Sequence, residues 1–263
     1  MAINLQYMDP EAIRIGPLSL KWYGISYALG ILICCALIRK LSKLHKLYLP
    51  ESLSNNIEIY CMIGIIFGGR IGYMLIYAWN SLMLEPMSLF YIWEGGMSFH
   101  GGLIGMILVI LLVSYAYKMN PFILYDLIAV VVPLGLFFGR LANFINAELR
   151  GRPSDITWSV IFYDEDFSRH PSQLYEAFGE GILLFAIMLF LSRFFKFGSG
   201  FLSSAFLVLY SIIRAFLECY REPDSNIGFI ADKYTMGQLL SIVNLIFGFM
   251  ILVISLAKNK KYK

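Results

Sequence analysis

Long apolar runs recur from one end of this chain to the other, and they constrain the fold more than any other feature. A helix needs about 20 residues to cross the hydrocarbon core of a bilayer, and the length of each run is close to that. These runs fall at residues 18–38, 57–79, 98–117, 121–139, 173–192, 200–217 and 236–257. The runs are near-continuous in Leu, Ile and Phe, without the alternation of a half-buried strand. The sequence therefore predicts an all-α, polytopic membrane bundle of about seven transmembrane helices.

The composition and the connections between the runs indicate one domain. Hydrophobic residues make up 59% of the chain and charged residues only 15%, well outside the range of soluble globular domains. No Pro/Ser-rich linker separates the runs. We therefore expect a single integral membrane domain over residues 1–263, with a small extracytoplasmic segment at 140–172.

Basic residues set the expected orientation, because Lys and Arg are more frequent in cytoplasmic loops. They follow the first, third and fifth runs and form the tail, as Arg39, Lys40, Lys43, Lys46, Lys118, Arg193, Lys196, Lys258, Lys260, Lys261 and Lys263. With seven spans, this places the N-terminus outside, the C-terminus in the cytoplasm and the 140–172 segment on the outer side.

Arginines gather on this predicted outer side, as Arg14, Arg140, Arg150, Arg152, Arg169 and Arg221. The planar guanidinium group binds phosphate through two parallel hydrogen bonds, which the ammonium group of lysine cannot do. An arginine cluster at this depth suggests a phospholipid head group as ligand. Alternatively, each arginine simply extends along the apolar surface to the membrane interface.

Neither a cofactor nor a metal is expected. The four cysteines, at positions 34, 35, 61 and 219, have no Cys-x-x-Cys spacing, and we expect free, buried thiols that pack as small apolar residues. The chain has three histidines, none beside an acidic cluster, so it offers no metal-ligand set. It also lacks a Walker loop and a Gly-x-Gly-x-x-Gly turn.

His100 lies between glycines at the outer end of the third run, in GMSFHGGLIG at 96–105. A titratable imidazole at the edge of the hydrocarbon must be paired, hydrated or functional. Gly101 and Gly105 form a Gly-x-x-x-Gly face that lets a helix or a substrate approach the backbone closely. A structural histidine bonded to a neighbouring side chain would give the same pattern.

A second polar group, GRLANFINAELRGRP at 139–153, follows the fourth run. Arg140, Asn143 and Asn146 are spaced by three residues and so share a helical face. This set suits a phosphate and the hydroxyls of a glycerol. The asparagines could instead cap the helix end, since Gly151 and Pro153 mark a stop, but capping explains one asparagine and not the row.

The third group, YSIIRAFLECYREPD at 210–224, carries a polar stripe on the sixth run. Its members recur at spacings of four, four and three, as Tyr210, Arg214, Glu218 and Arg221. The stripe could line a cavity for an anionic lipid. Alternatively, Arg214 and Glu218 form an ion pair that braces neighbouring helices.

Together these groups resemble the bacterial prolipoprotein diacylglyceryl transferases. The matching stretches are KWYGISYALG at 21–30, GGMSFHGGLIG at 95–105, GRLANFINAELRGRP, RHPSQLYEA at 169–177 and YSIIRAFLECYREPD. They follow the family's order and span nearly the whole chain. Ala142 and Ala147 occupy positions where the family pattern has glycine, a difference that affects helix packing and removes no polar group.

The resemblance implies a reaction and its partners. A diacylglyceryl group moves from phosphatidylglycerol to the lipobox cysteine of a preprolipoprotein, and glycerol phosphate is released. The partners are then phosphatidylglycerol, the signal-peptide and lipobox segments of preprolipoproteins and other membrane lipids, with no nucleic acid. The location is the bacterial cytoplasmic (inner) membrane, with the active site toward the outer leaflet.

The resemblance also implies roles for individual residues. His100 is the candidate base that forms the thiolate, and Arg140 and Arg214 are the candidate clamps for the phosphate. The nucleophile belongs to the substrate, so none of the four cysteines is needed. The residues expected to bind phosphatidylglycerol with Arg140 are Tyr23, Asn143, Asn146, Glu148, Gly151, Tyr210, Glu218 and Arg221. His170 is left out, because Pro171 in the same motif suits the start of the fifth span.

Two other functions compete with this interpretation. An intramembrane serine protease could use Ser98, but the later spans contain no histidine and Gly-x-Ser-x-Gly is missing. A transporter or lipid flippase would also line a cavity with arginines, yet no inverted repeat is visible.

Overall fold

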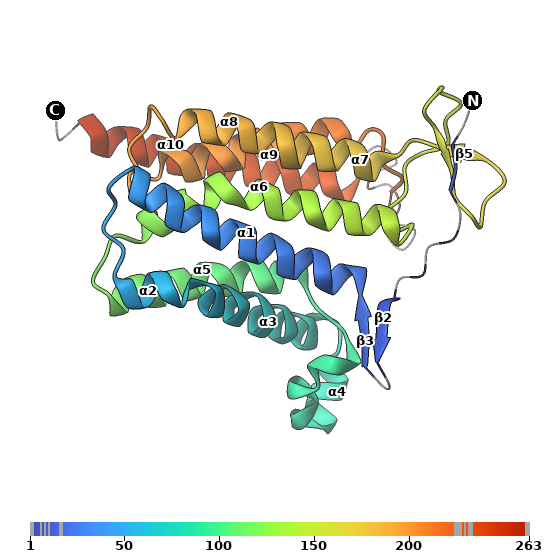
Figure 1. The fold of residues 1–263 in the computed structure, drawn as a ribbon, viewed down its shortest axis with the longest axis horizontal. Coiled ribbons are helices and arrows are strands. Elements are labelled where there is room, and N and C mark those ends of the chain that lie inside the picture. The colour runs from blue at the N-terminus through green and yellow to red at the C-terminus, as the bar shows by residue number, and fades with distance from the viewer. Residues whose placement is uncertain are drawn as a thin grey trace. The chain divides into compact units, whose positions relative to one another are not determined.

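The computed structural model describes residues 3–5, 7, 9, 11–15, 18–223, 228, 230 and 234–260 (Figure 1). Its longer helices are α1 (Trp22–Leu44), α3 (Ile57–Ile76), α5 (Phe99–Ala116), α6 (Pro121–Ile145), α8 (Leu184–Leu191), α9 (Phe201–Leu217) and α10 (Met236–Lys260). Its shorter helices are α2 (Glu51–Asn55), α4 (Trp79–Leu84), η1 (Pro86–Phe90), η2 (Ile92–Glu94), α7 (Ser172–Glu176) and the π-helical η3 (Ala177–Leu183). The strands are β1 (Ile3–Asn4), β2 (Glu11–Ile15), β3 (Leu18–Lys21), β4 (Val160–Ile161) and β5 (Ser168–Arg169).

Each of the seven predicted runs contains a helix, which confirms the polytopic helical fold. Within the described residues, six segments are long and apolar enough to cross a membrane: Trp22–Leu44, Ile57–Ile76, Phe99–Ala116, Pro121–Ile145, Ser172–Leu191 and Met236–Ala257. The remaining run forms the 17-residue apolar helix Phe201–Leu217. The fifth span is continuous through α7, η3 and α8, and it begins after Pro171, as the sequence predicted.

Two predicted runs had wrong boundaries. The first was expected at residues 18–38, but residues 18–21 form β3 and α1 continues to Leu44. The fourth run was expected to end at residue 139, whereas α6 continues to Ile145. Hydropathy places a boundary at the polar residues Arg140 and Asn143, but in the protein these side chains have polar partners and the helix continues through them. Residues 140–145 therefore belong to the helix and not to the outer segment.

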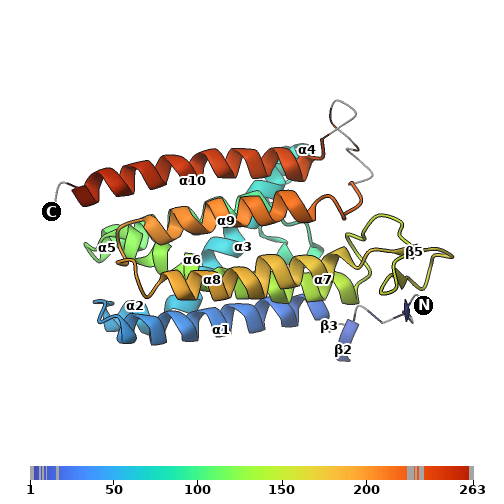
Figure 2. The same cartoon turned by 90° about the horizontal axis from the view of Figure 1, so that it is seen from above.

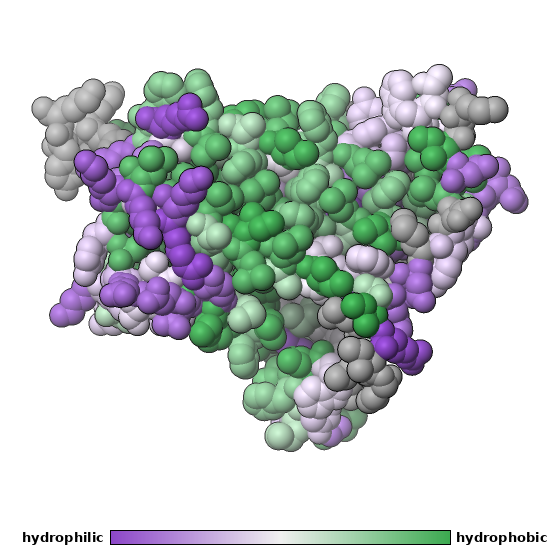
Figure 3. Space-filling view, viewed as in Figure 1, coloured by the Kyte–Doolittle hydropathy of each residue, from purple (hydrophilic) through white to green (hydrophobic). Residues whose placement is uncertain are grey.

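The surface of these helices suits a bilayer. Large hydrophobic side chains are more than half exposed on several helices, among them Leu112, Phe216 and Phe247. On the face shown in Figure 3, hydrophobic residues cover the middle of the helices and hydrophilic residues gather toward their ends. Lipid, and not water, is the solvent that matches such a surface.

The chain divides into two compact units, each described here by itself. Unit 1 comprises Met1–Ile38 and Asp126–Lys263, and unit 2 comprises Arg39–Tyr125. Within unit 1, α9 lies between α10 and the helical run α7–η3–α8 (Figure 2). The prediction of one domain over the whole chain stays a prediction.

Glycines set the packing of unit 2. On α5, Gly101 and Gly105 meet Gly64, Gly68 and Gly72 of α3, so that the two helix backbones touch. A Cβ atom at Gly105 would lie 2.8 Å from the Gly68 Cα atom and would also collide with the Gly64 carbonyl oxygen. The predicted Gly-x-x-x-Gly packing face is therefore confirmed, and its partner is α3.

Short strands in unit 1 join the segment before α1 to the connection between α6 and α7. β1 pairs in parallel with β4, and β4 pairs antiparallel with β5. The sheet thus ties Ile3–Asn4 to the connection between α6 and α7. β2 and β3 form a separate antiparallel hairpin immediately before α1.

The cysteines follow the prediction in part. All four are reduced thiols. Cys35 is buried, and Cys34 and Cys61 are half-buried, but Cys219 is exposed. Cys219 comes two residues after the end of α9, where the chain leaves the helical layer, so the prediction that every thiol is buried was wrong there.

Candidate functional site

Two buried glutamates in unit 1 join two arginines that lie on different helices. Arg140 is on α6 and Arg214 on α9, whereas Glu176 ends α7 and Glu180 lies in η3. Arg140 Nη1 is 2.9 Å from Glu176 Oε2, and Arg140 Nη2 is 3.0 Å from Glu180 Oε2. Arg214 Nη1 is 2.8 Å from Glu176 Oε1 and 3.1 Å from Glu180 Oε1. Each carboxylate therefore contacts both guanidinium groups, and we call these four residues the Arg–Glu cluster.

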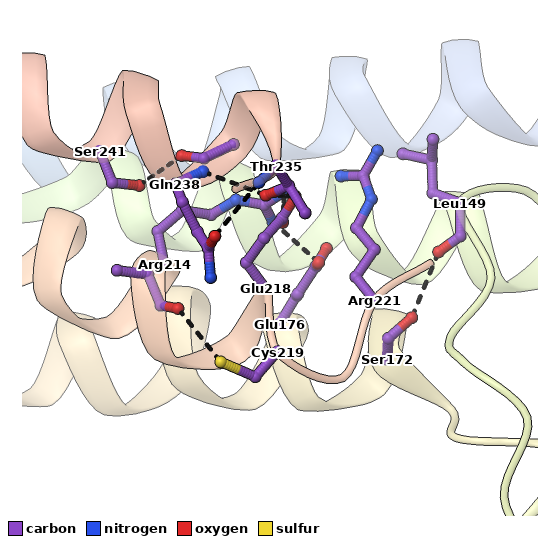
Figure 4. A network of polar contacts seen from close by, with 12 residues as sticks. Leu149, Ser172, Glu176, Arg214, Glu218, Cys219, Arg221, Thr235, Gln238 and Ser241 are labelled. Atoms are coloured by element: carbon purple, nitrogen blue, oxygen red, sulfur yellow. Dashed lines mark hydrogen bonds and ion pairs between the residues drawn. The ribbon is translucent and has the colours of Figure 1, made fainter. Parts of the chain in front are cut away.

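Glu218 extends the cluster toward α10. Arg214 Nη2 donates to Glu218 Oε2 at 2.5 Å, and Thr235 Oγ1 donates to Glu218 Oε1 at 3.0 Å. A Cβ atom at Gly237 would lie 2.6 Å from the Glu218 carboxyl carbon, so glycine makes room for this carboxylate. Figure 4 shows Glu176, Glu218 and Thr235 gathered near the end of α9, with Arg221 beside them.

The ion pair expected between Arg214 and Glu218 is therefore present. Through Arg214 the pair reaches the α7–η3 run, and through Thr235 it reaches the start of α10. The alternative in which this ion pair braces neighbouring helices is thus confirmed. The role of these residues in lipid binding stays a prediction.

A smaller polar group lies where α1 faces the end of α6. The buried Asn143 donates through Nδ2 to the hydroxyl of Tyr23, which is half-buried. The Glu148 carboxylate is within hydrogen-bonding reach of the same hydroxyl, and the charge of Arg140 is close enough to act on it. The structure thus brings together Tyr23, Asn143, Glu148 and Arg140, as the sequence analysis expected of a shared site.

Tyr210 lies beside the Arg–Glu cluster. It is half-buried on α9, one helical turn before Arg214. Its phenol lies close enough to both arginines and both glutamates of the cluster to interact with their charges. Its hydroxyl therefore faces a strongly polar region inside the helical layer.

The remaining residues of unit 1 that were predicted to bind phosphatidylglycerol differ in their surroundings. Asn146 is half-buried, and its Oδ1 atom is buried with no hydrogen-bond partner in the described part of the chain. Arg221 is buried near the cluster and shares a β-bridge with Gly151. A Cβ atom at Gly151 would collide with the His170 carbonyl oxygen, so Gly151 permits a close backbone contact.

His100 belongs to unit 2. It is the second residue of α5, two positions after the N-cap residue Ser98, and its side chain is exposed. Ser98 Oγ accepts a hydrogen bond from the Gly101 backbone N–H at 3.2 Å, which fixes the start of the helix. Phe99 contacts the imidazole edge-on, with ring centroids 5.6 Å apart.

Arg70 was not identified from the sequence, although it holds the segment that leads to His100. It is buried on α3 and donates to the backbone carbonyl groups of Ser88, Leu89, Gly95 and Gly96. The Ser98 backbone N–H donates to the Gly69 carbonyl oxygen at 2.9 Å. Arg70 and Gly69 therefore fix the loop that enters α5. Hydropathy could have indicated a role, because an arginine inside a long apolar run needs polar partners.

Glu176 and Glu180 were also missed by the sequence analysis. Both side chains are fully buried, at 0% exposure. The signal was available, because two acidic residues four positions apart inside an apolar run are rare and costly. Their arginine partners are 34 to 40 residues away in sequence, and only the packing of α6 and α9 on this run brings them together.

Two of the arginines that were predicted to lie on the outer side serve local structure. Arg150 pairs with Asp164 at 2.8 Å and Glu165 at 3.1 Å, and Arg169 pairs with Glu165 at 2.6 Å. Arg150 lowers the pKa of Asp164 by hydrogen bonding to its carboxylate. Arg150 and Arg169 of the expected outer cluster are therefore ion-paired with nearby carboxylates. Arg140, Arg214 and Arg221 lie in or beside the Arg–Glu cluster.

Known proteins are similar to this chain over nearly its whole length. The sequence profile of the family described as prolipoprotein diacylglyceryl transferase matches residues 10–254. Three relatives named phosphatidylglycerol–prolipoprotein diacylglyceryl transferase are each 44% identical. The protein of Rickettsia akari (strain Hartford) aligns over 92% of this chain and 94% of its own length. The protein of Bordetella bronchiseptica aligns over 90% and 92%, and that of Ehrlichia ruminantium (strain Welgevonden) over 94% and 97%.

Proposed function

This chain belongs to the prolipoprotein diacylglyceryl transferase family, and from that premise we propose that it modifies bacterial preprolipoproteins with lipid. It transfers the diacylglyceryl group of phosphatidylglycerol to the lipobox cysteine thiol, in the first step of lipoprotein maturation. The observation that carries this proposal is the 44% identity over at least 90% of the chain to relatives that bear this name. The pair Arg140 and Arg214 of unit 1 supports it, because the leaving group of this reaction is a phosphate.

The reaction requires a base that deprotonates the substrate thiol and positive groups that stabilise the leaving phosphate. The substrate thiol loses its proton, and the sulfur attacks the glyceryl carbon to form a thioether. The bond between that carbon and the phosphate oxygen breaks, and glycerol phosphate leaves with the electron pair. A thiol with a pKa of about 8.5 is a weak nucleophile until it is deprotonated. The departing phosphate gains negative charge, which positive groups held in place stabilise.

We assign the first task to His100 and the second to Arg140 and Arg214. An imidazole has an unperturbed pKa of about 6.5, which suits a general base near neutral pH. His100 is exposed at the start of α5, so a substrate can reach it. Both arginines keep a small exposed part of the side chain, 15% for Arg140 and 9% for Arg214.

The other polar residues of unit 1 are assigned to binding the head group. Tyr23, Asn143 and Glu148 adjoin Arg140, and Asn146 Oδ1 is an acceptor that a glycerol hydroxyl can satisfy. Tyr210 and Glu218 adjoin Arg214, and Arg221 is close enough to Glu176 for their charges to interact. Gly151 contributes by its close backbone packing against His170.

The proposed location is the bacterial cytoplasmic (inner) membrane, with the N-terminus outside and the C-terminus in the cytoplasm. The distribution of Lys and Arg between loops supports this orientation. It places the active site toward the outer leaflet, where lipobox segments emerge with the signal peptide. Phosphatidylglycerol and other membrane lipids are then partners, and nucleic acid is not.

The test is a transfer reaction with defined components. Purified protein is incubated with phosphatidylglycerol and a lipobox peptide, and the peptide is analysed by mass spectrometry. The expected product is a diacylglyceryl adduct on the cysteine, and a matched peptide with serine in place of cysteine should gain nothing. A folded protein that moves phosphatidylglycerol between leaflets but forms no adduct is a flippase, and this result would overturn the assignment.

A further inference from the structure

The Arg–Glu cluster has a geometry that the proposed reaction alone does not explain. Each of the two fully buried carboxylates contacts both guanidinium groups, at 2.8 to 3.1 Å. Two guanidinium groups this close repel each other when the surroundings are poor in water. Carboxylates that bridge both arginines remove this repulsion and set the distance between them. The α7–η3 run therefore acts as a spacer between the arginine of α6 and the arginine of α9.

Glycines let the spacer reach both neighbours. Gly179 and Gly181 flank Glu180 and face opposite sides of the run. A Cβ atom at Gly181 would lie 2.7 Å from Phe137 Cβ on α6, and one at Gly179 would lie 2.9 Å from Leu217 Cδ1 on α9. At Gly181 the neighbours include the Phe137 Cα atom at 3.0 Å, so an alanine there requires a shift of the helix, whereas at Gly179 the Leu217 side chain would have to move. The π-helical turn that carries Glu180 is also of a kind that occurs often at functional sites.

The hydrogen-bonding pattern leaves part of Arg140 available. Its Nε and Nη2 atoms donate to Glu180 Oε2 at 3.2 and 3.0 Å. Its Nη1 atom is 2.9 Å from Glu176 Oε2, but that oxygen accepts no aligned hydrogen bond. This contact is therefore coulombic, and the hydrogens on Nη1 remain for a substrate oxygen. Glu180 fixes one edge of the guanidinium plane while another edge can meet a phosphate.

The region carries no excess positive charge. Arg140, Arg214 and Arg221 face three carboxylates, those of Glu176, Glu180 and Glu218. Glu148 adds a fourth carboxylate near Arg140. A phosphate diester brings one negative charge and the released glycerol phosphate brings up to two. A cluster with excess positive charge would hold this product tightly, whereas one without that excess holds it weakly. The carboxylates thus favour release as well as position.

We propose that Glu176 and Glu180 are positioning residues. They hold Arg140 and Arg214 at the spacing that binds the phosphate of the donor lipid, and they limit the affinity for the glycerol phosphate that leaves. This inference rests on the proposed function. Neither glutamate touches the reacting atoms in this account. Both act through the arginines, which are preorganised before the substrate arrives.

The experiment compares Glu176→Gln and Glu180→Gln with the unchanged protein in the peptide transfer assay. Each variant keeps the shape of the side chain and removes its charge. We expect kcat per folded molecule to fall about tenfold or more, because each loses a charge-assisted contact to both arginines. We expect the KM for phosphatidylglycerol to stay equal or fall, and inhibition by added glycerol phosphate to become stronger. A purely structural residue would lower the folded fraction and leave kcat per folded molecule unchanged.

Two further variants cover the case in which a glutamine variant does not fold. Glu180→Asp keeps the charge but shortens the side chain, and Gly181→Ala keeps every charge and moves the helix away from α6. Both should lower kcat without strengthening inhibition by glycerol phosphate. Glu58→Gln is the matched control, because Glu58 forms a 2.5 Å ion pair with Arg39 in unit 2, and its kcat should not change.

The outcomes separate the two proposals. If the unchanged protein forms no adduct, the proposed function fails. If it forms the adduct and any folded variant of Glu176, Glu180 or Gly181 keeps the original kcat, the positioning role fails and the function is unaffected.

Discussion

Replacing Arg140 with lysine keeps a positive charge but removes the fork that joins two carboxylates. In the structure, Arg140 donates twice to Glu180 and forms an ion pair with Glu176. A lysine side chain ends in one ammonium nitrogen, which cannot reproduce the contacts that the Nε, Nη1 and Nη2 atoms of Arg140 make in one plane. At least one charge-assisted contact is lost, at about 1.5–3 kcal/mol, so the transfer rate at limiting phosphatidylglycerol should fall about ten- to a hundredfold. Arg140→Ala should lower this rate further, since it removes every contact of the guanidinium group, and it should also destabilise the protein by about 3–5 kcal/mol, because it leaves buried carboxylates without their partner.

The assay measures kcat/KM for phosphatidylglycerol with a lipobox peptide, and thermal unfolding in detergent gives the folded fraction. Arg39→Lys is the control, because Arg39 pairs with Glu58 and 31% of its side chain is exposed. The control should lose little, since solvent screens partly exposed pairs. An Arg140→Lys protein that is folded and keeps the original kcat/KM would refute the role of the guanidinium fork.

Other changes test separate parts of the account. His100→Gln should leave lipid binding nearly intact and slow the transfer, with partial recovery at higher pH as the peptide thiol ionises near its own pKa; loss of lipid binding without recovery at any pH would make the histidine structural. Residues 39–46 should be protected from an impermeant label applied outside, while a cysteine in place of Asp164 should react, and the reverse result would invert the topology. Gly105→Leu should lower the thermal stability of the protein, because even a Cβ atom collides with α3; an unchanged melting temperature would contradict the packing. Transfer should persist when alanine replaces every cysteine, and a lipid adduct on any of them in the unchanged protein would contradict the mechanism. These are Cys34, Cys35, Cys61 and Cys219.

The helices and some of the polar faces could be predicted from the sequence, because both depend on local spacing. Runs of apolar residues gave the spans with ends that differ from the helices by six residues or fewer, and a spacing of four placed Arg214 with Glu218. The glycine spacing on α5 gave a packing face, although not its partner. Such features need only the period of a helix and the thickness of a bilayer.

Long-range pairing could not be predicted in the same way. Glu176 and Glu180 pair with arginines that come before and after them in the chain, and no local pattern says which arginine meets which acid. The end of α6 was misplaced for the same reason, since the partners of Arg140 lie on another helix. Arg70 donates to backbone carbonyl groups, which have no sequence signature at all.

The same pairing explains how this chain can hold charges within its helices. An isolated arginine or glutamate in the hydrocarbon region is costly, whereas paired and hydrogen-bonded charges are tolerated. In unit 1 the partners of the arginines come from α7 and η3, so the charges are balanced only after α6, α9 and this run have packed together. Assembly of the helices and formation of the arginine pair are therefore one event. We therefore expect a variant that removes one partner to affect both folding and the rate of transfer, and only rates expressed per folded molecule can separate the two effects.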